Sequence, residues 1–388
     1  MGRAEEILDA MFPDILDLSR KIYKFAEIGS SEKKSSAALN RFLSEHGFSV
    51  QQPFANMDTA FKATRGKGKI RVGFLAEYDA LPNGHSCGHN LISAWALGSA
   101  ALLADLSDKF TISVFGTPSE EGIGEYAGSK VTMSEMRVFS DIDFIFGFHA
   151  DDRWAVGSVA LADSTLEITF TGKESHGADA PESGINALDA AVSAYNAINS
   201  LRGWSKNDKN LVVGMIFKEA GEATNIIPGK AVLLVEIRST SYEFAGRFSE
   251  KVRKAAIASA DIFGAVASIR TAAPFYREYL PNFLLDELLL ESLHKYGIEA
   301  HNIDRDPPIA SGSTDEANVS HFVPVGHMDM KIGFPGIPGH TDDFRIASEP
   351  DKNSINMRVA ILSTVSAAIS AADKLEDVKS EFRRRKGE

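Results

Sequence analysis

The stretch KIRVGFLAEYDALP, residues 69–82, contains the segment that decides the fold. Its residues from Ile70 to Leu75 are mostly apolar, and a continuous apolar run of this length is typical of a strand buried on both faces. Two acidic residues, Glu77 and Asp79, follow the run directly. We therefore predict a buried strand that ends in carboxylates.

Two further segments have the same design. FTISVFGTPSEEG, residues 110–122, ends in Glu120 and Glu121, and DIDFIFGFHADD, residues 141–152, contains His149 near its end. Helical patterns lie between these strands, which favours a mostly parallel sheet flanked by helices on both faces. Because chemistry gathers at the carboxyl ends of parallel strands, these polar residues are expected to form one site.

The pattern changes after this α/β region. STLEITFTGK and KAVLLVEIRST alternate apolar with polar residues, and two helices accompany these two strands, which predicts an inserted α+β domain over residues 164–273. Residues 1–163 and 274–388 would then form one discontinuous catalytic domain. At its two ends we expect a first helix broken near Pro13 and one long final helix over residues 354–382.

Composition narrows the class of protein. The 388 residues carry a net charge of −12 and contain a single cysteine. An acidic chain without a basic stripe is not expected to bind nucleic acid. The first residues lack the apolar core of a signal peptide, and we find no uninterrupted apolar run of the roughly 20 residues that span a bilayer. A lone cysteine forms no internal disulfide, so we expect a cytoplasmic protein without a membrane anchor.

The single cysteine lies in NGHSCGHN, residues 83–90, where Cys87 has His85 and His89 as near neighbours. A thiolate and an imidazole are both good ligands for zinc and similar ions. A redox group, a nucleophile and a small buried apolar residue are the alternatives for this thiol.

The adjacent acids Glu120 and Glu121 would repel each other unless a cation or a proton lies between them. One of them can bind metal while its neighbour takes a proton from an activated water, although acids are also common at solvated helix starts. His149 and a histidine in a Pro/Gly-rich loop, His340, are ambiguous alone. Together the candidates suffice for two metal ions; they are Cys87, His89, Glu121, His149 and His340.

Two other chemistries fit less well. The G-x-G-x-x-A pattern over residues 122–127 is separated from its strand by TPSEE, whereas a dinucleotide-binding turn follows its strand directly. No G-x-S-x-G motif at a strand-to-helix turn indicates a serine hydrolase.

Six motifs in order resemble the M20 metallopeptidase and amidohydrolase family, especially its aminoacylase-like and aminobenzoyl-glutamate hydrolase-like branch. They are AEYDALPNGHSCGHN, GTPSEEG, GFHADD, GKESHGADAPESGINALDAA, NIIPGKAVLLVEIRS and PGHTDDF. The resemblance covers about residues 15 to 370. It implies a catalytic domain with a dinuclear metal site, and an inserted lid domain through which the protein forms a homodimer.

The resemblance also implies roles for individual residues. Cys87 would bridge the two ions, with His89, Glu121, His149 and His340 completing the ligand set, and Glu120 would be the general base. Many members have His-x-Asp-x-x-Pro after the first strand, whereas this chain has Glu77 in place of that histidine. His89 would replace the missing ligand, and Asp79 would orient a ligand histidine from outside. His85 has no assigned role.

Three residues of the insert receive roles from the resemblance alone. His176 would stabilise the oxyanion, in its own subunit or across the dimer, and Asn225 and Arg238 would bind the substrate carboxylate. The expected protein is thus a metal-dependent amidohydrolase, with zinc or manganese preferred and cobalt or nickel compatible. Its substrate would be a small N-acyl amino acid, an aminobenzoyl-glutamate-like amide or a dipeptide. The alternatives are a carboxypeptidase or aminopeptidase acting on short peptides, and an inactive binding protein of the same fold.

Overall fold

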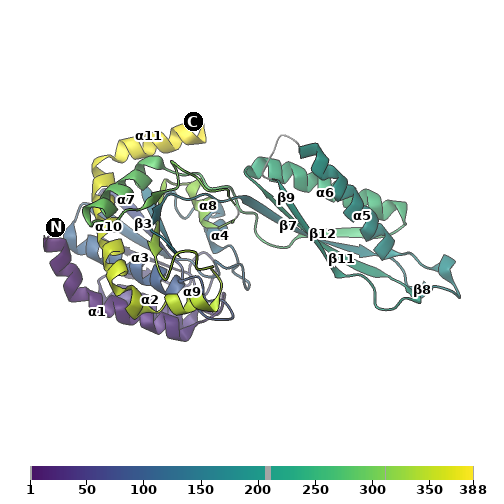
Figure 1. Cartoon of the computed structure of the whole chain (residues 1–388), viewed down its shortest axis with the longest axis horizontal. Helices are drawn as coiled ribbons and strands as arrows, with labels where there is room; N and C mark the ends of the chain where they lie inside the picture. Colours follow the sequence, from purple (N-terminus) through teal and green to yellow (C-terminus); the bar gives the residue numbers. More distant parts are fainter. Residues whose placement is uncertain (1, 206–210, 311, 388) are drawn as a thin grey trace. The chain divides into compact units, whose positions relative to one another are not determined.

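The computed structural model describes residues 2–205, 211–310 and 312–387. Five residues of the expected insert, 206–210, lie outside this description. The chain divides into two compact units (Figure 1). The first unit contains Met1–Val159, Tyr279–Ile309 and Thr314–Glu388, and the second unit contains Ala160–Glu278 and Ala310–Ser313.

An eight-stranded sheet lies at the centre of the first unit, with the strand order β1-β2-β4-β3-β5-β14-β6-β13. The strands are β1 (Ser49–Gln51), β2 (Phe61–Arg65), β3 (Ile70–Ala76), β4 (Phe110–Gly116), β5 (Phe144–Asp151), β6 (Ala155–Val156), β13 (His301–Asn302) and β14 (Val325–Lys331). The central strands β4, β3, β5 and β14 are parallel, whereas β2 and β1 add antiparallel pairs at one edge. The predicted mostly parallel sheet is confirmed.

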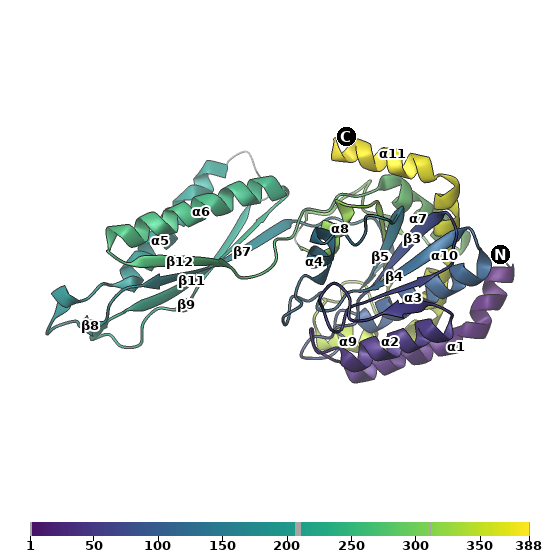
Figure 2. The same ribbon diagram turned by 180° about the vertical axis from the view of Figure 1, so that it is seen from behind.

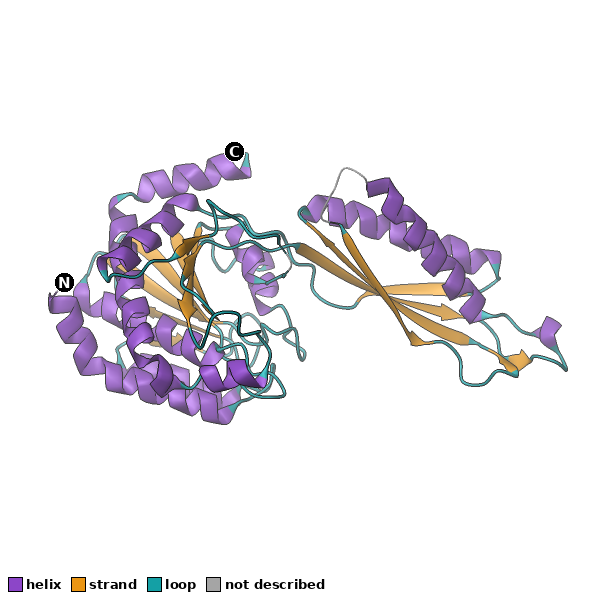
Figure 3. Cartoon of the chain, in the orientation of Figure 1, coloured by secondary structure: helices purple, strands orange, loops and turns teal. Residues whose placement is uncertain are grey.

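Helices surround this sheet (Figure 3). They are α1 (Gly2–Phe25), α2 (Lys33–Glu45), α3 (His89–Leu106), α4 (Ser129–Glu135), α7 (Phe283–Lys295), α8 (Glu316–Ser320), α9 (Asp342–Ala347), η3 (Pro350–Asn353), α10 (Ser354–Asp373) and α11 (Leu375–Lys386). Helix α3 packs on β3, β4 and β5, and α4 packs against α8, as Figure 2 shows from behind. Helices α7 and α10 contact β14.

Helix α3 is the centre of this packing, and its small residues explain why. A Cβ atom on Gly98 would lie 2.9 Å from the terminal methyl groups of both Ile15 in α1 and Ile361 in α10, so glycine lets these two helices pack closely on α3. The buried Trp95 ring packs on Phe148 of β5 at 4.3 Å. The ring N–H of Trp95 donates a 3.0 Å hydrogen bond to Thr364 of α10.

Two predictions about the terminal helices are wrong. Helix α1 continues through Pro13 because buried apolar residues on both sides, including Leu8 and Leu18, keep one face against the core, while Pro13 itself is exposed. The expected single final helix is two helices, α10 and α11. In α11, the Glu381 carboxylate accepts hydrogen bonds from the first backbone N–H groups of α7, at 2.9 and 3.1 Å.

The second unit combines an antiparallel sheet with two long helices, so it is an α+β domain, as the sequence predicts. Its elements are β7 (Ala162–Thr171), β8 (Ser175–His176), η1 (Pro181–Ser183), α5 (Ala187–Leu201), η2 (Arg202–Ser205), β9 (Val212–Glu219), β10 (Ile226–Ile227), β11 (Lys230–Ser239), α6 (Tyr242–Ile262) and β12 (Val266–Thr271). The larger sheet has the order β12-β7-β11-β9 and its own core with α5 and α6. The prediction of two strands missed the edge strands β9 and β12, whose residues are largely exposed and give a weak apolar pattern.

One segment, Pro350–Asp373, is long and apolar enough to cross a membrane by length and composition. It contains Asn356 and Arg358, so it is not an uninterrupted apolar run. Helix α10 packs against α3, α7 and β14, and 56% of the apolar window is buried inside the structure. Because the core helix of a soluble protein passes the same test, this is weak evidence for a membrane span.

The strand order also locates a site. The chain leaves β3, returns as β4 on one side of it, and then returns as β5 on the other side. Loops that leave the carboxyl ends of such neighbouring strands in opposite directions open a crevice where ligands bind in α/β sheets. The residues that follow β3 and β4, and those at the carboxyl end of β5, lie at this switch point of the sheet.

Candidate metal centre

The Cys87 thiol lies in the loop between β3 and α3, with Sγ 3.2 Å from Nε2 of His149 in β5. Gly88 makes this contact possible, because it has a left-handed φ of 81° and a Cβ there would lie 2.6 Å from Ala150. Burial raises the pKa of the thiol, but the neighbouring His149 and His89 rings outweigh burial and hold that pKa well below its usual value. Cys87 is therefore held as the thiolate, which is the metal-binding form.

Seven side chains form three overlapping ligand groups, within each of which one atom per residue lies within 4.8 Å of the others. The groups are Cys87, His89 and His149; Cys87, Glu121 and His340; and Glu77, His89 and Glu120. The structure thus brings together all five ligand candidates from the sequence. It adds Glu77, the residue that stands where many M20 members have a histidine.

Two atoms of the cluster lack a hydrogen-bond partner among the described residues. They are Nε2 of His89 and Oε1 of Glu121, both buried and 3.8 Å apart. Burial, followed by the Cys87 thiolate, raises the pKa of Glu121 to about 8, so its carboxylate is poorly stabilised by the protein alone. Since buried polar atoms are normally paired and this donor set of sulfur, nitrogen and oxygen suits zinc and similar ions, the residues fit a divalent cation.

Asp79 fixes two of these ligand residues from outside the cluster. Its Oδ1 atom accepts a 2.9 Å hydrogen bond from Nδ1–H of His89, and its backbone carbonyl accepts a second one at 3.1 Å. Its other oxygen, Oδ2, accepts the backbone N–H of Glu121 at 3.1 Å. This arrangement fixes the orientation of the His89 ring, with Nε2 directed toward the other ligand candidates.

We predict that Asp79→Asn weakens metal binding by about 10- to 100-fold, the usual cost of losing an outer partner of a ligand. The asparagine amide cannot accept both the His89 and the Glu121 N–H groups. Competition with a coloured chelator measures the affinity. Asp143→Asn is the matched control, because Asp143 accepts the Arg71 N–H at 2.7 Å just before β5 begins, at the other end of the sheet. Equal affinities in the wild type and Asp79→Asn would contradict this role.

His340 comes from the loop before α9, and the backbone brings it to the cluster. Its N–H donates a 2.9 Å hydrogen bond to the carbonyl of Ser86, and its own carbonyl accepts one from Asn83 at 3.3 Å. Its φ of 64° is left-handed, an unusual conformation for a residue other than glycine. Nε2 of His340 lies 3.4 Å from Oε2 of Glu121.

Glu120 lies beside the cluster with its two carboxylate oxygens in different surroundings. Oε2 lies 3.9 Å from Nε2 of His89, whereas Oε1 accepts a 2.9 Å hydrogen bond from the Thr314 hydroxyl. Burial, followed by the negative charge of Glu77, raises the pKa of Glu120 well above its usual value. A carboxyl group with a raised pKa, placed next to a metal centre, is suited to carry a proton.

Sequence analysis missed a buried ion cluster next to Glu120. The Lys130 ammonium is fully buried and contacts Asp315, and it lies 2.9 Å from Oε1 of Glu77. Asp315 also accepts the backbone N–H of Lys130 at 3.1 Å. Lysines are almost always exposed, so a lysine in AGSKVT gives no sequence signal for burial.

His85, which had no assigned role, belongs to none of the ligand groups among the described residues. Its Nε2–H donates a 3.0 Å hydrogen bond to the carbonyl of Ile22 in α1, and its ring stacks near Tyr23. Burial, followed by the charge of His89, lowers the pKa of His85 to about 4, so the ring is neutral. His85 therefore ties the ligand loop to α1.

The three remaining residues predicted from the sequence lie in the second unit. His176 in β8 is exposed, and its Nδ1 accepts the N–H groups of Ala178 and Asp179 at 3.3 and 3.1 Å, so Nε2 carries the proton. Asn225 is adjacent, because its carbonyl accepts the N–H of Gly177 at 2.8 Å. Arg238 lies elsewhere, eight residues along β11 from Lys230 and roughly 26 Å from that end of the strand at about 3.3 Å per residue.

Arg238 has carboxylate partners of its own within the second unit. Its guanidinium lies 3.2 Å from Asp163 and 3.0 Å from Glu236. The structure therefore brings His176 and Asn225 together and places Arg238 at a different end of the sheet.

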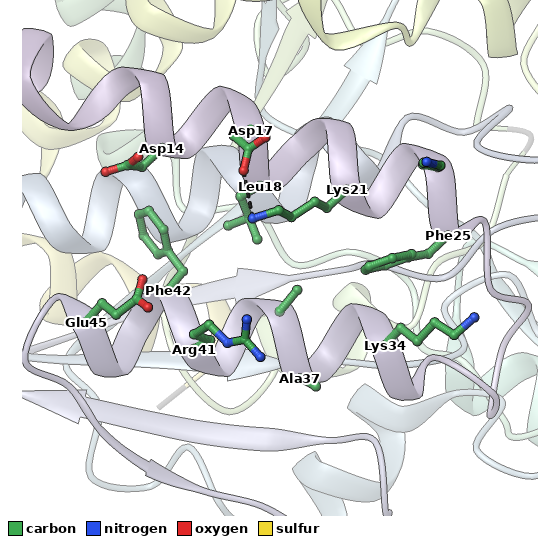
Figure 4. A pocket seen from close by; sticks show the side chains of 12 residues that line it. Asp14, Asp17, Leu18, Lys21, Phe25, Lys34, Ala37, Arg41, Phe42 and Glu45 are labelled. Atoms are coloured by element: carbon green, nitrogen blue, oxygen red, sulfur yellow. Dashed lines mark ion pairs between the residues drawn. The ribbon is translucent and has the colours of Figure 1, made fainter.

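A second concave feature of the first unit is a groove of about 600 Å³ between α1 and α2 (Figure 4). Phe25 and Phe42 contribute apolar surface, and Lys21 pairs with Asp17 across one turn of α1 at 2.7 Å. None of the ligand candidates lines this groove. The cluster of ligand candidates is thus separate from it.

Comparison with known proteins identifies the family. The chain is 31% identical over 405 residues to Xaa-Arg dipeptidase of Homo sapiens, covering 98% of this chain and 91% of that protein. Residues 164–260 match the M20 peptidase dimerisation domain. The chain belongs to the M20 family. The resemblance inferred from the sequence motifs is thereby confirmed.

Other M20 relatives extend the comparison. The chain is 26% identical to one of the subunits of p-aminobenzoyl-glutamate hydrolase from Escherichia coli (strain K12), over 74% of this chain and 63% of that protein. The fold is similar to a dinuclear metal-binding peptidase of the M20 family from Bacillus subtilis, with a TM-score of 0.63, 19% identity and coverage of 92% and 99% of the two chains. The M20 dimerisation match lies within the second unit.

Proposed function

We propose that this M20 protein is a metal-dependent amidohydrolase that cleaves the amide bond of a small N-acyl amino acid, an aminobenzoyl-glutamate-like amide or a dipeptide. The observation that carries the proposal is the position of Glu120, whose Oε2 lies 3.9 Å from Nε2 of the ligand candidate His89. The names of its relatives, a dipeptidase and an aminobenzoyl-glutamate hydrolase, support the substrate class.

We propose two divalent ions, held by Cys87 as the shared ligand with His89 and His149 on one side and Glu121 and His340 on the other. Zinc or manganese is the first choice, and cobalt or nickel is compatible with the same ligands. When bound, these ions would supply Lewis-acid activation of the scissile carbonyl and of the attacking water.

The chain itself supplies the proton transfers. Glu120 would take a proton from the attacking water on Oε2 and deliver it to the leaving amine nitrogen, which becomes a free amine as the C–N bond breaks. The raised pKa of Glu120 supports this role, because a carboxyl group must hold the proton between the two steps. His176 would donate from Nε2–H to the oxyanion that forms on the carbonyl oxygen.

We further propose that residues 164–273 form a lid through which two chains make a homodimer. Asn225 and Arg238 would both bind the substrate carboxylate. Within the second unit of a single chain, however, they lie farther apart than the length of a dipeptide. Two chains resolve this difficulty, because His176 and Asn225 of one chain and Arg238 of the other can serve one site. A mass of one chain, 42.0 kDa, by light scattering would contradict the dimer.

A single thiol used as a ligand supports a cytoplasmic location.

A substrate panel on apoprotein reloaded separately with zinc, manganese, cobalt or nickel tests the activity. The panel contains hippurate, p-aminobenzoyl-glutamate, alanyl-arginine and the tripeptide trialanine. We expect at least one of the first three to be cleaved with a kcat/KM more than about tenfold above that of the tripeptide, because the remote groups of a matched substrate contribute binding energy. Preferential tripeptide cleavage would favour a short-peptide peptidase, and no cleavage with any ion would favour an inactive binding protein.

A further inference from the structure

Thr314 contacts the proposed base directly. It precedes α8, and its hydroxyl donates a 2.9 Å hydrogen bond to Oε1 of Glu120. The backbone N–H of Glu316 donates to the same hydroxyl oxygen at 3.3 Å. Since that N–H occupies an acceptor position of the oxygen, the hydroxyl proton is directed at Glu120.

The two residues after Thr314 are fixed by buried charged groups. Asp315 pairs with the buried Lys130 ammonium, which also lies 2.9 Å from Glu77. Glu316 accepts hydrogen bonds from the Tyr279 hydroxyl at 2.9 Å and from Nδ1 of His327 at 2.7 Å. The Thr314 hydroxyl is therefore held by a short segment that has little freedom to shift.

The hydrogen bond from Thr314 gives the two carboxylate oxygens of Glu120 different roles. With Oε1 held by Thr314, rotation of the carboxylate about its terminal bond is restricted, and Oε2 stays on the side of His89. A hydrogen bond to a charged group is worth more than one between neutral groups, so it can hold one orientation of a side chain. Small errors in the position of a proton-transfer group reduce the rate strongly.

We propose that Thr314 is a positioning residue that holds Glu120 with Oε2 directed at the reacting atoms. This inference rests on the proposed role of Glu120 as the base. It assigns Oε2 as the atom that carries the proton and Oε1 as the anchored oxygen.

The test compares Thr314→Val, which keeps the shape and removes the hydroxyl, with Thr314→Ser, which keeps the hydroxyl. Both are assayed on the panel substrate that the wild type cleaves fastest. We expect Thr314→Val to lower kcat by about 10- to 100-fold, with KM changed less than about twofold and bound metal unchanged. Thr314→Ser should keep at least about one third of the wild-type kcat.

Ser320→Ala is the matched structural control, in the helix α8 that follows Thr314. The Ser320 hydroxyl is buried, accepts the N–H of Leu280 at 2.9 Å and donates to the carbonyl of Ala317 at 2.8 Å, without touching Glu120. We expect this variant to melt at a lower temperature and to keep the wild-type kcat.

Glu120→Gln separates the two proposals. If Glu120→Gln is inactive while Thr314→Val keeps the wild-type kcat, the positioning role of Thr314 is wrong, whereas the role of Glu120 as the base stands. If Thr314→Ser loses as much activity as Thr314→Val, the methyl group rather than the hydroxyl matters, and the positioning role is also wrong. If Glu120→Gln keeps its turnover, the proposed base is wrong and the role of Thr314 falls with it.

Discussion

Glu120→Gln is expected to retain its metal and to lose about 10²- to 10⁴-fold in kcat, the range that general acid–base catalysis contributes. Glutamine has nearly the same shape and can still accept the Thr314 hydrogen bond. Its amide cannot take up a proton near neutral pH, so both proton transfers lose their carrier. Steady-state kinetics, together with metal content by mass spectrometry, measure the two expectations separately.

The control for this variant is Glu125→Gln, which removes an exposed carboxylate from the same loop. It should keep both its metal and its turnover. A Glu120→Gln protein with a normal kcat would refute the proton-transfer role. A Glu120→Gln protein without metal would instead show that Glu120 belongs to the ligand set, as its presence in the group with Glu77 and His89 permits.

Cys87→Ala should lower metal affinity by more than the roughly 10- to 100-fold that outer-partner changes cost, because it deletes a ligand itself. Cys87 is a member of two of the three ligand groups, so both proposed ions lose a ligand at once. Metal stoichiometry after dialysis against a chelator measures this loss. The rise in melting temperature on adding zinc should disappear as well, since only a bound ion stabilises the folded state.

His85→Gln is the control for Cys87→Ala, because His85 lies two residues away, is equally buried and contacts Ile22 rather than the ligand groups. This variant should bind metal with the wild-type stoichiometry, even if it is less stable. Retention of both ions in Cys87→Ala would show that the thiol is a packed neighbour of the centre and not a ligand.

The sequence predicted β3, β4 and β5 of the first unit, because each is an apolar run with polar residues at its end. It did not predict the other strands of this sheet, which are β1, β2, β6, β13 and β14. Elements decided by tertiary contacts were harder. Pro13 is a helix breaker by propensity, yet a continuous buried face carries α1 through it. The break between α10 and α11 lies at Lys374, and within α11 Glu381 contacts the start of α7, a tertiary contact that no local pattern reveals.

The candidate site shows the same difference between residues that local motifs indicate and residues that depend on tertiary contacts. Cys87, His89 and Glu121 belong to short motifs with ligand chemistry, so residue type and position after a strand indicate them. Lys130 and Thr314 belong to no such motif. Their importance comes from what lies next to them in space, and only the folded chain shows that the buried Lys130 contacts Glu77 and that the Thr314 hydroxyl contacts Glu120.

The backbone hydrogen bond between His340 and Ser86 has a consequence for how the protein is made. It joins parts of the chain that are far apart in sequence, and a second bond joins Asn83 to the same loop. On the ribosome, the amino-terminal ligands emerge long before residue 340 is synthesised. The full set of candidate ligands can therefore assemble only after most of the chain has left the ribosome, so the proposed metal binding would be a late event in the maturation of this protein.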